Sequence, residues 1–204
     1  MRLATIDDLP AMTDFIYERF SKLEYFTFLT EGMEDQEAFL KKLIIAELPL
    51  LIKYGEIRLY GEPLAGLISG IPSKDFTLMR QIICSFPVRK IIRTIPKKEQ
   101  KQFMRKNKQI GEIHYSLPWH KKYSKNSYYI SQIAVAKEAK GTGLLREMLT
   151  PIMADCQKKN MDIVLETMSE ANVPIYQHFG FELVEFHHSS SVPFDEYCFI
   201  KRAT

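Results

Sequence analysis

A glycine-containing turn in the C-terminal half of the chain has residue types that could hold a phosphate. Lys140, Gly141, Thr142 and Gly143 follow a short apolar run, and a helical pattern begins at Leu144. A helix start presents unpaired N–H groups and a positive dipole end, and glycines let N–H groups approach an anion closely. Lys140 would add a positive charge and Thr142 a hydroxyl donor. A tight turn that only connects a strand to a helix could have the same sequence, so both interpretations stay open.

The segments around this turn must position it. Residues 128–136 are rich in Tyr, Ile and Val and predict a strand. From Leu144 onward, apolar residues at helical spacing predict an amphipathic helix, which Pro151 must bend. Further along, the pattern predicts a buried strand at 162–165, a short helix at 172–179 that stops at Gly180, and strands at 181–186 and 196–201.

The N-terminal half predicts the remaining elements of a mixed α/β domain. In order, these are a strand at 2–5, a helix to Phe20 with Asp7 and Asp8 as N-cap candidates, an aromatic connector at 24–32, a helix at 33–47, and strands at 56–60 and 64–71. Prolines then divide the middle of the chain into helical pieces and loops. We expect one domain over residues 1–204, with residues 72–127 as an insertion or elaborated connection.

Composition favours a soluble globular protein, since 46% of the 204 residues are hydrophobic and 26% are charged. The cysteines at 84, 156 and 198 form no CxxC pair, which predicts a reduced, intracellular protein without disulfides. The most apolar run, residues 43–52, is too short to span a bilayer and contains Glu47. The N-terminus lacks the apolar core of a signal peptide. We therefore expect a cytoplasmic location and no membrane partner.

Positive charge is concentrated between Arg89 and Lys108, where nine Lys or Arg and one Glu give a local charge of 9 − 1 = +8. The whole chain carries only +3. Such a cluster can form a solvated helix face or attract an anion, such as a cofactor phosphate, an acidic substrate, nucleic acid or a membrane surface. Phe103 is the one aromatic residue within it, so stacking on nucleic acid bases is not favoured.

The glycine turn and residues 165–186 together resemble the GCN5-related N-acetyltransferase (GNAT) superfamily. In that family a [QR]xxGx[GA] loop grips the coenzyme A pyrophosphate; Gly141 and Gly143 match its glycines, whereas Glu138 replaces the first residue. The resemblance is closest to a subgroup marked by Pro151, Leu165-Glu166-Thr167, Asn172, Tyr176 and Gly180-Phe181. It implies the GNAT fold, a mixed, mostly antiparallel sheet with helices on both faces and a helical insertion after the third strand.

The resemblance also implies acetyl-coenzyme A as co-substrate. Its pyrophosphate would lie on residues 140–144, and its pantetheine amides would pair with the backbone of Ile133, Ala134 and Val135, as an added strand does. An ordinary core strand would have the same sequence. Asn172 would either hydrogen-bond the cofactor or cap the short helix after it.

Tyr176 is implied as the general acid that protonates the departing thiolate; its alternative is a core aromatic residue with its hydroxyl tied to the backbone. The general base is less clear, with Glu166 as the tentative candidate beside Glu112, His114 or a chain of waters. His187 and His188 suggest a metal ligand pair, but they lack Cys or acid partners at ligand spacing, so we expect no metal. His120 and His178 are expected at the surface.

The implied reaction is acetyl transfer to the primary amine of an unidentified small-molecule or peptide acceptor, in one ternary complex of a monomer or homodimer. The acceptor site is expected at residues 24–32, the insertion and the final hairpin, where Tyr25, Phe26, Phe28 and Trp119 lie. Two alternatives stay open. One is a catalytically weak acyl-coenzyme A sensor, prompted by Glu138 and the uncertain base. The other is a nucleic-acid-associated protein that uses residues 89–108.

Overall fold

The computed structural model describes residues 1–114 and 119–203, and their strands form one sheet. The strand order is β1-β2-β3-β4-β5-β7-β6, and every neighbouring pair is antiparallel except β4 and β5. The bounds are β1 (Arg2–Leu3), β2 (Glu56–Tyr60), β3 (Gly66–Pro72), β4 (Ser127–Val135), β5 (Asp162–Thr167), β6 (Glu182–His187) and β7 (Glu196–Lys201). The predicted mixed α/β class with a mostly antiparallel sheet is confirmed.

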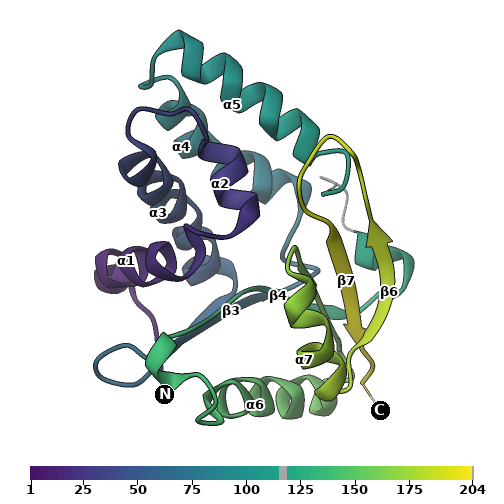
Figure 1. The fold of residues 1–204 in the computed structure, drawn as a ribbon. Coiled ribbons are helices and arrows are strands. Elements are labelled where there is room, and N and C mark those ends of the chain that lie inside the picture. Colours follow the sequence, from purple (N-terminus) through teal and green to yellow (C-terminus); the bar gives the residue numbers. More distant parts are fainter. Residues whose placement is uncertain (115–118, 204) are drawn as a thin grey trace.

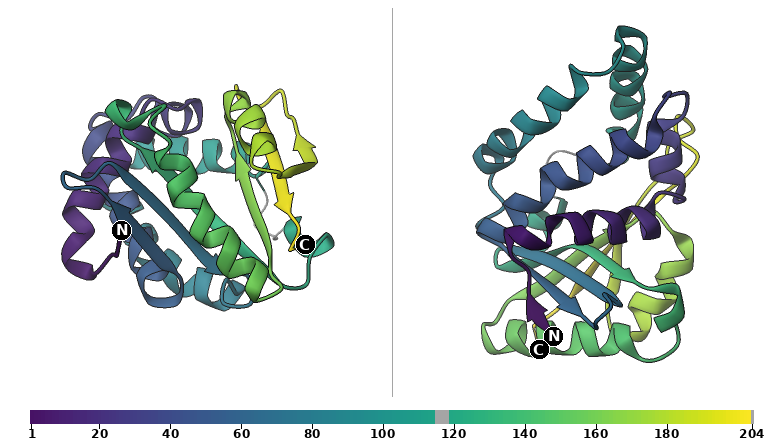
Figure 2. Two further views of the ribbon diagram at one scale, coloured as in Figure 1. Left: turned by 90° about the horizontal axis from the view of Figure 1, so that it is seen from below. Right: turned by 90° about the vertical axis from the view of Figure 1, so that its left-hand side faces the viewer.

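Helices cover both faces of this sheet (Figures 1 and 2). The longer helices are α1 (Leu9–Phe20), α2 (Glu24–Thr30), α3 (Gln36–Tyr54), α4 (Leu78–Ile92), α5 (Lys97–Ile110), α6 (Leu144–Lys158) and α7 (Val173–His178). Short 3-10 turns occupy Ile6–Asp8, Trp119–Lys122, Lys137–Ala139 and Glu170–Asn172. Helices α1 and α3 pack on one face and α6 on the other, while α4 and α5 lie at the end of the molecule away from α6.

Helix α6 has the amphipathic pattern that its sequence predicts. Met148, Leu149, Ile152 and Cys156 are buried at helical spacing and face the strands, whereas Glu147 is exposed. Pro151 lies inside the helix and removes one backbone hydrogen bond there. Burial of this apolar stripe therefore holds the helix, and the turn that begins it, against the sheet.

The pairing between β4 and β5 is short. Only Ser127, Tyr128 and Tyr129 of β4 pair with β5, although β4 continues to Val135 and β5 to Thr167. Beyond this point the two strands diverge, and α7 lies beside the opening between β4 and the C-terminal strands (Figure 1).

Several expectations about the N-terminal half and the insertion were wrong in detail. Residues expected as an aromatic connector form α2, because Leu29 and Thr30 can be buried on one side of a helical turn. Helix α3 continues to Tyr54 through Pro49, and α4 contains Pro87. Proline costs a hydrogen bond in a helix, but burial of neighbouring side chains outweighs that cost.

The Trp119–Lys122 turn also differs from expectation. His120, expected at the surface, is 3% exposed, and burial followed by the charge of Lys121 lowers its pKa to about 4. Trp119 is buried beside it against β5 and β7. The turn therefore belongs to the core rather than to an open loop, and His120 is neutral at physiological pH.

The basic cluster of residues 89–108 covers the end of α4 and most of α5. Most of its side chains are at least partly exposed, as a solvated helix face requires. Lys106 is the exception among the basic residues: its side chain is 3% exposed, and its Nζ donates to the Glu31 carboxylate and the Phe28 carbonyl, both at 2.6 Å. This contact fastens α5 to α2.

Cys156 and Cys198 are buried free thiols. Within the described residues, no helix combines the length and the apolar character needed to cross a membrane.

Replacing Leu149 tests whether α6 depends on its buried stripe. Leu149→Ala removes a side chain that is 0% exposed, so the free energy of unfolding should fall by about 2–5 kcal/mol. Denaturant unfolding would measure the loss, with Glu147→Ala on the exposed side as the matched control. Equal, small effects of both changes would contradict the assigned helix orientation.

Candidate functional site

The first part of the candidate site is the open edge of β4. The Ala136 amide donates to the Ala65 carbonyl at 2.7 Å, which makes Gly66 and Val135 a non-hydrogen-bonded pair. By alternation, the N–H and C=O groups of Ile133 and Val135 point away from β3, toward the opening. No backbone partner for them occurs on that side among the described residues. The opening therefore presents unpaired strand backbone.

The side chains of this edge follow the predicted alternation. Ile133 and Val135 pack toward α6, whereas Ala134 is buried on the face that carries α1 and α3. A molecule that lies in the opening would therefore meet the unpaired backbone groups of Ile133 and Val135.

The glycine turn lies at the start of α6, next to the end of β4. Gly141 has φ +78° and Gly143 has φ +89°, a left-handed region that favours glycine. A Cβ at either position would meet nothing within 4 Å, so open space adjoins the backbone. Gly143 precedes the first residue of a 15-residue helix, where N–H groups have no partner within the helix. This geometry suits an anion.

Lys140 is exposed in this turn, but the Thr142 hydroxyl differs from expectation. It donates to the Ala139 carbonyl at 2.8 Å. Thr142 therefore uses its proton within the turn, and the Thr142 oxygen is left as an acceptor.

Tyr176 lies on α7, and its ring packs in the core against Phe181 and Phe199, at centroid distances of 5.9 and 5.5 Å. Its hydroxyl has no hydrogen-bond partner among the described residues, so the alternative of a hydroxyl tied to the backbone does not hold. Burial, followed by the charge of Glu166, raises the pKa of Tyr176 to about 12. The hydroxyl thus keeps its proton at physiological pH.

Asn172 precedes α7 but does not cap it. Its side-chain amide donates to the Thr167 hydroxyl at 3.0 Å, and no cap hydrogen bond forms. The capping alternative was wrong, and Asn172 instead ties the start of α7 to the end of β5.

Glu166 lies on β5 with both carboxylate oxygens engaged. Tyr129 donates to one oxygen, and the Trp119 indole N–H donates to the other at 3.1 Å. Burial raises the pKa of Glu166, and the nearby charge of His114 partly opposes this effect. A raised pKa suits a proton acceptor that works near neutral pH.

The two other base candidates have different surroundings. Glu112 accepts a hydrogen bond from the Ser189 hydroxyl at 2.6 Å, which lowers the pKa of Glu112. His114 Nδ1 lies 2.5 Å from a Glu196 carboxylate oxygen. Burial lowers the pKa of His114, but the hydrogen bond and the charge of Glu196 outweigh it and raise the pKa to about 9. His114 is therefore a cation at neutral pH and not a base.

Sequence reasoning missed Glu47, Glu196 and Tyr129 as parts of this region. Glu47 lies on α3 and is exposed to water, yet protein lies close enough around it for burial to raise its pKa to about 6, with His114 opposing. Burial raises the pKa of Tyr25 and of Tyr129, and the charge of Glu47 contributes to both increases. The one signal was an acidic residue inside the most apolar run of the chain.

The structure supplies acid and thiol partners for His187 that its sequence neighbours do not. Possible ligand atoms of His187, Glu196 and Cys198 all lie within 4.8 Å of one another. His187 Nδ1 is 3.1 Å from Glu196, and its Nε2 is 2.8 Å from Glu185. His187 therefore has acid and thiol neighbours in three dimensions that its sequence spacing does not predict, and these groups already bond to one another.

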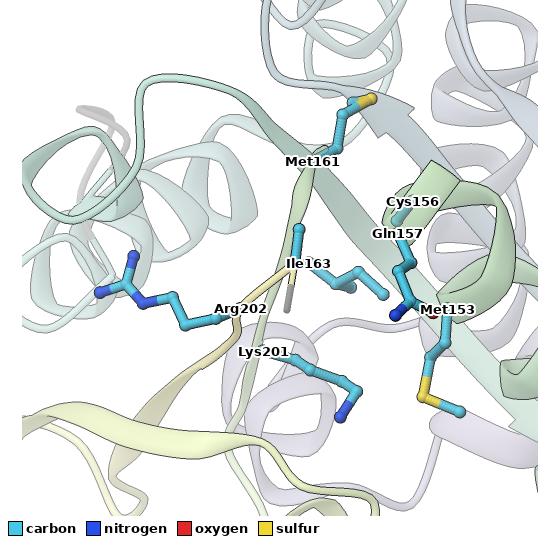
Figure 3. Close-up of a pocket in the computed structure, with 8 residues that line it drawn as sticks. Met153, Cys156, Gln157, Met161, Ile163, Lys201 and Arg202 are labelled. Atoms are coloured by element: carbon cyan, nitrogen blue, oxygen red, sulfur yellow. The ribbon is translucent and has the colours of Figure 1, made fainter. Parts of the chain in front are cut away.

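A separate hollow lies between the C-terminal part of α6 and the ends of β5 and β7 (Figure 3). Cys156, Ile163 and Lys201 are among its lining residues, and it contains none of the predicted site residues. Arg202 points away from the side chains of Lys201 and Met153 and pairs with Asp162 at 3.2 Å. The hollow is therefore not part of the candidate site.

One comparison with known proteins matches the segment that contains β4, the glycine turn and α7. A family model described as an acetyltransferase (GNAT) domain matches residues 116–184. An uncharacterized N-acetyltransferase of Schizosaccharomyces pombe is 38% identical over 56 residues, which are 28% of this chain and 23% of that protein. The match thus spans less than a quarter of that relative's length.

Solved structures share the fold over nearly the whole chain. A histone acetyltransferase HPA2 and related acetyltransferase from Corynebacterium glutamicum has a TM-score of 0.64 and 19% identity, with 98% of this chain and 94% of that chain covered. Arylalkylamine N-acetyltransferase 2 of Aedes aegypti has a TM-score of 0.62 and 9% identity, with 100% of this chain and 98% of that chain covered. Polyamine N-acetyltransferase of Drosophila melanogaster has a TM-score of 0.57 and 12% identity, with 98% of each chain covered. These likenesses establish the fold alone.

The pairing of His114 with Glu196 predicts a pH dependence. The folded pKa of about 9 exceeds the ordinary 6.5, so the stability from this pair is fully present below about pH 6.5 and is lost as the pH rises toward 9. NMR titration of the imidazole should show a midpoint near pH 9 for His114, which Glu196→Gln should bring well below that value. An ordinary midpoint in the unmodified protein would contradict the assigned contact.

Proposed function

Because this chain belongs to the GNAT acetyltransferase superfamily, we propose that it is an N-acetyltransferase, which moves an acetyl group from acetyl-coenzyme A to a primary amine of a small molecule. The observation that carries the proposal is the opening beyond Tyr129, where unpaired β4 backbone adjoins a glycine turn at a helix start. The unpaired backbone of β4 can form hydrogen bonds with amides, and the glycine turn can bind phosphate. Coenzyme A carries both amide and phosphate groups.

The residues present fit acetyl-coenzyme A. Ile133 and Val135 would pair with its amides through backbone groups, with Ala134 between them. Residues 140–144 would hold its pyrophosphate through N–H groups and the charge of Lys140. The open space beside Gly141 and Gly143 supports this assignment, because a side chain at either position would project into it. Acetyl-coenzyme A supplies the activated acetyl thioester.

The side chains near the opening supply the proton transfers. The acceptor amine must lose its proton before it attacks, and Glu166, with its raised pKa, is the proposed acceptor of that proton, directly or through water. The new N–C bond replaces the S–C bond of the thioester. Tyr176 gives its hydroxyl proton to the sulfur, and its lack of another hydrogen-bond partner leaves it free to do so. The nitrogen loses its second proton as the amide forms, and that proton restores the Tyr176 hydroxyl through water.

Direct transfer between two bound substrates is consistent with the raised pKa values of two buried cysteine thiols. Burial raises the pKa of Cys156 to about 11 and raises the pKa of Cys198 still further. A thiolate is the nucleophilic form of cysteine, so neither of these two residues is suited to carry the acetyl group covalently. One ternary complex requires no such carrier.

A small amine is the proposed acceptor rather than a peptide. Two neighbours in the fold comparison are described as polyamine and arylalkylamine N-acetyltransferases, which supports a small amine for this chain, while a third is described as a histone acetyltransferase. Tyr25 packs its ring against Phe26 and Phe194, at centroid distances of 4.8 and 5.7 Å, and these rings form the apolar surface proposed for the acceptor.

Acetyl-coenzyme A should bind at the glycine turn, and calorimetric titration would measure it. Gly141→Glu with Gly143→Glu adds bulk and like charge next to a pyrophosphate, so affinity should fall at least ~10-fold. Thr150→Glu with Ala154→Glu adds the same charge on exposed positions of α6 and should change little. Lys140→Glu, which retains both glycines, should also weaken binding.

Equal affinity of the Lys140→Glu variant, the glycine variant and the parent protein would remove the turn from the site. Absence of binding to the parent protein would remove the proposed function.

Tyr176→Phe should lower kcat by about 10²–10⁴-fold, because the sulfur loses its proton donor, while the Kd for acetyl-coenzyme A stays within about twofold. Release of free thiol with an accepted amine would measure the rate. Tyr123→Phe is a control, since its hydroxyl bonds to the Val184 carbonyl and Glu185 instead. An unchanged kcat in Tyr176→Phe would exclude Tyr176 as the acid.

A further inference from the structure

One side of helix α4 exposes a group of large apolar side chains. Each is more than two-fifths exposed, and the group consists of Leu78 (61%), Met79 (66%), Ile82 (41%), Ile83 (55%) and Phe86 (57%). At 3.6 residues per turn, these positions fall within about 140° of the helix circumference, so they form one apolar face. Single apolar residues are common on protein surfaces, but a contiguous group of this kind marks an interaction surface.

The fold holds α4 through its other side. Val88, Ile91 and Ile92 pack against the apolar cluster to which α2, α3 and α5 also contribute. The Arg80 guanidinium pairs with Asp75 at 2.7 Å and thereby fixes the start of the helix. Packing within the protein therefore accounts for these residues of α4 and leaves the apolar face to water.

The exposed side of α4 becomes basic after Phe86. Arg89, Lys90 and Arg93 lie within the same arc as the apolar face, and all three are exposed. Helix α5 follows and exposes five further basic side chains, which are Lys97, Lys98, Lys101, Arg105 and Lys108. None of these eight residues forms an ion pair with a carboxylate of the described residues. This uncompensated positive charge is complementary to an anionic partner.

Three kinds of partner differ in how well they fit this combination. A second copy of the chain would bring two uncompensated basic clusters together. Nucleic acid would satisfy the basic residues but leave four apolar side chains without packing, and the one exposed aromatic residue of α4, Phe86, has the Arg89 guanidinium 5.8 Å from its ring centroid. A bilayer that contains anionic lipids matches both parts, because apolar side chains enter the acyl boundary while Lys and Arg meet the headgroups.

We propose that α4 docks the protein on an anionic membrane surface. The apolar face of α4 enters the boundary between headgroups and acyl chains, and the exposed basic residues of α4 and α5 lie against the headgroups. The expectation of no membrane partner came from the lack of a segment long enough to span a bilayer, and a helix that lies on the surface needs no such segment. This contact goes beyond the proposed acetyl transfer and does not depend on it.

Docking through α4 keeps the glycine turn away from the bilayer. Helices α4 and α5 lie at the end of the molecule away from α6, and the turn comes directly before α6 (Figures 1 and 2). A protein bound to the membrane through α4 would therefore leave this turn open to water.

Co-sedimentation of the purified protein with lipid vesicles tests the proposal without any cofactor. Vesicles of phosphatidylcholine with about 30% phosphatidylserine should bind the protein at least about tenfold more tightly than phosphatidylcholine alone, because each basic residue near an anionic surface adds attraction. Raising the salt concentration from about 0.1 M to about 0.5 M should weaken this binding at least about tenfold, since salt screens the charges.

Two sets of substitutions separate the apolar part of the surface from the basic part. Ile83→Ser with Phe86→Ser should lower the affinity for anionic vesicles about tenfold or more, because less apolar surface leaves water. Arg89→Gln with Lys90→Gln and Arg93→Gln should lower it to a similar extent, about tenfold, and should also reduce its dependence on salt.

Matched controls change the same kinds of side chain elsewhere. Ile6→Ser with Phe186→Ser replaces side chains that are 56% and 53% exposed. Lys22→Gln with Lys125→Gln and Lys137→Gln removes three exposed positive charges. Both controls should bind anionic vesicles within about twofold of the parent protein. Because every substituted side chain is exposed, Tm should change little in all four variants.

A tryptophan on the apolar face reports insertion directly. The single tryptophan of the chain, Trp119, is 7% exposed, so Phe86→Trp adds a reporter at an exposed position. Its fluorescence should shift to the blue on binding to anionic vesicles and should be quenched by lipids with brominated acyl chains. Ile6→Trp should show neither change.

Equal binding to neutral and anionic vesicles, or losses in the controls as large as those in the α4 variants, would overturn the proposal. Binding to single-stranded RNA without binding to vesicles would assign the surface to nucleic acid instead, provided that the variant without the three basic residues loses it. A dimer of the parent protein that Ile83→Ser with Phe86→Ser dissociates, again without vesicle binding, would assign the apolar face to a second copy and overturn the proposal equally.

Discussion

The short pairing between β4 and β5 is the constraint on which the rest of the site depends. Two parallel strands share three residues of pairing at Ser127–Tyr129 and then separate, so backbone groups of β4 are left without backbone partners among the described residues. Unpaired strand edges are costly unless water or a ligand satisfies them. The glycine turn comes directly after this edge, and α7, which carries Tyr176, lies beside it. The divergence thus places unpaired strand backbone, the glycine turn and Tyr176 around one opening, where we propose that the cofactor binds.

The buried carboxylates of this region have specific partners in the fold. A buried carboxylate needs a counterion or hydrogen-bond donors, and the fold supplies His114 for Glu196 and two neutral donors for Glu166. Glu47 is treated differently, because it meets water and has no partner among the described residues.

Local sequence patterns predicted the elements that carry the chemistry. The strand at β4, the turn and helix α6 follow from alternation, glycine spacing and a strong apolar stripe, all of which act within a few residues. Gly141 and Gly143 could be identified because left-handed backbone positions in a turn favour glycine. The hydrogen bond from the Thr142 hydroxyl to the Ala139 carbonyl could not be predicted, because it depends on the conformation that the turn adopts.

The remaining contacts join residues that are far apart in the chain. Glu166 and Trp119 are 47 residues apart, and His114 and Glu196 are 82 apart, so no local pattern predicts either pair. Burial of His120 has the same origin, since a short polar-looking turn is covered by strands that come later. Glu47 was visible only as an acid inside an apolar run.

Residue-resolved amide hydrogen exchange, with and without saturating acetyl-coenzyme A, tests the central claim most directly. The N–H groups of Ile133 and Val135 point into the opening, so they should exchange fast in the free protein and become protected at least about tenfold in the complex. Ala134, which bonds toward β3, should change little. Saturable binding that leaves Ile133 and Val135 unprotected would contradict the claim that the divergence of β4 and β5 forms the cofactor site.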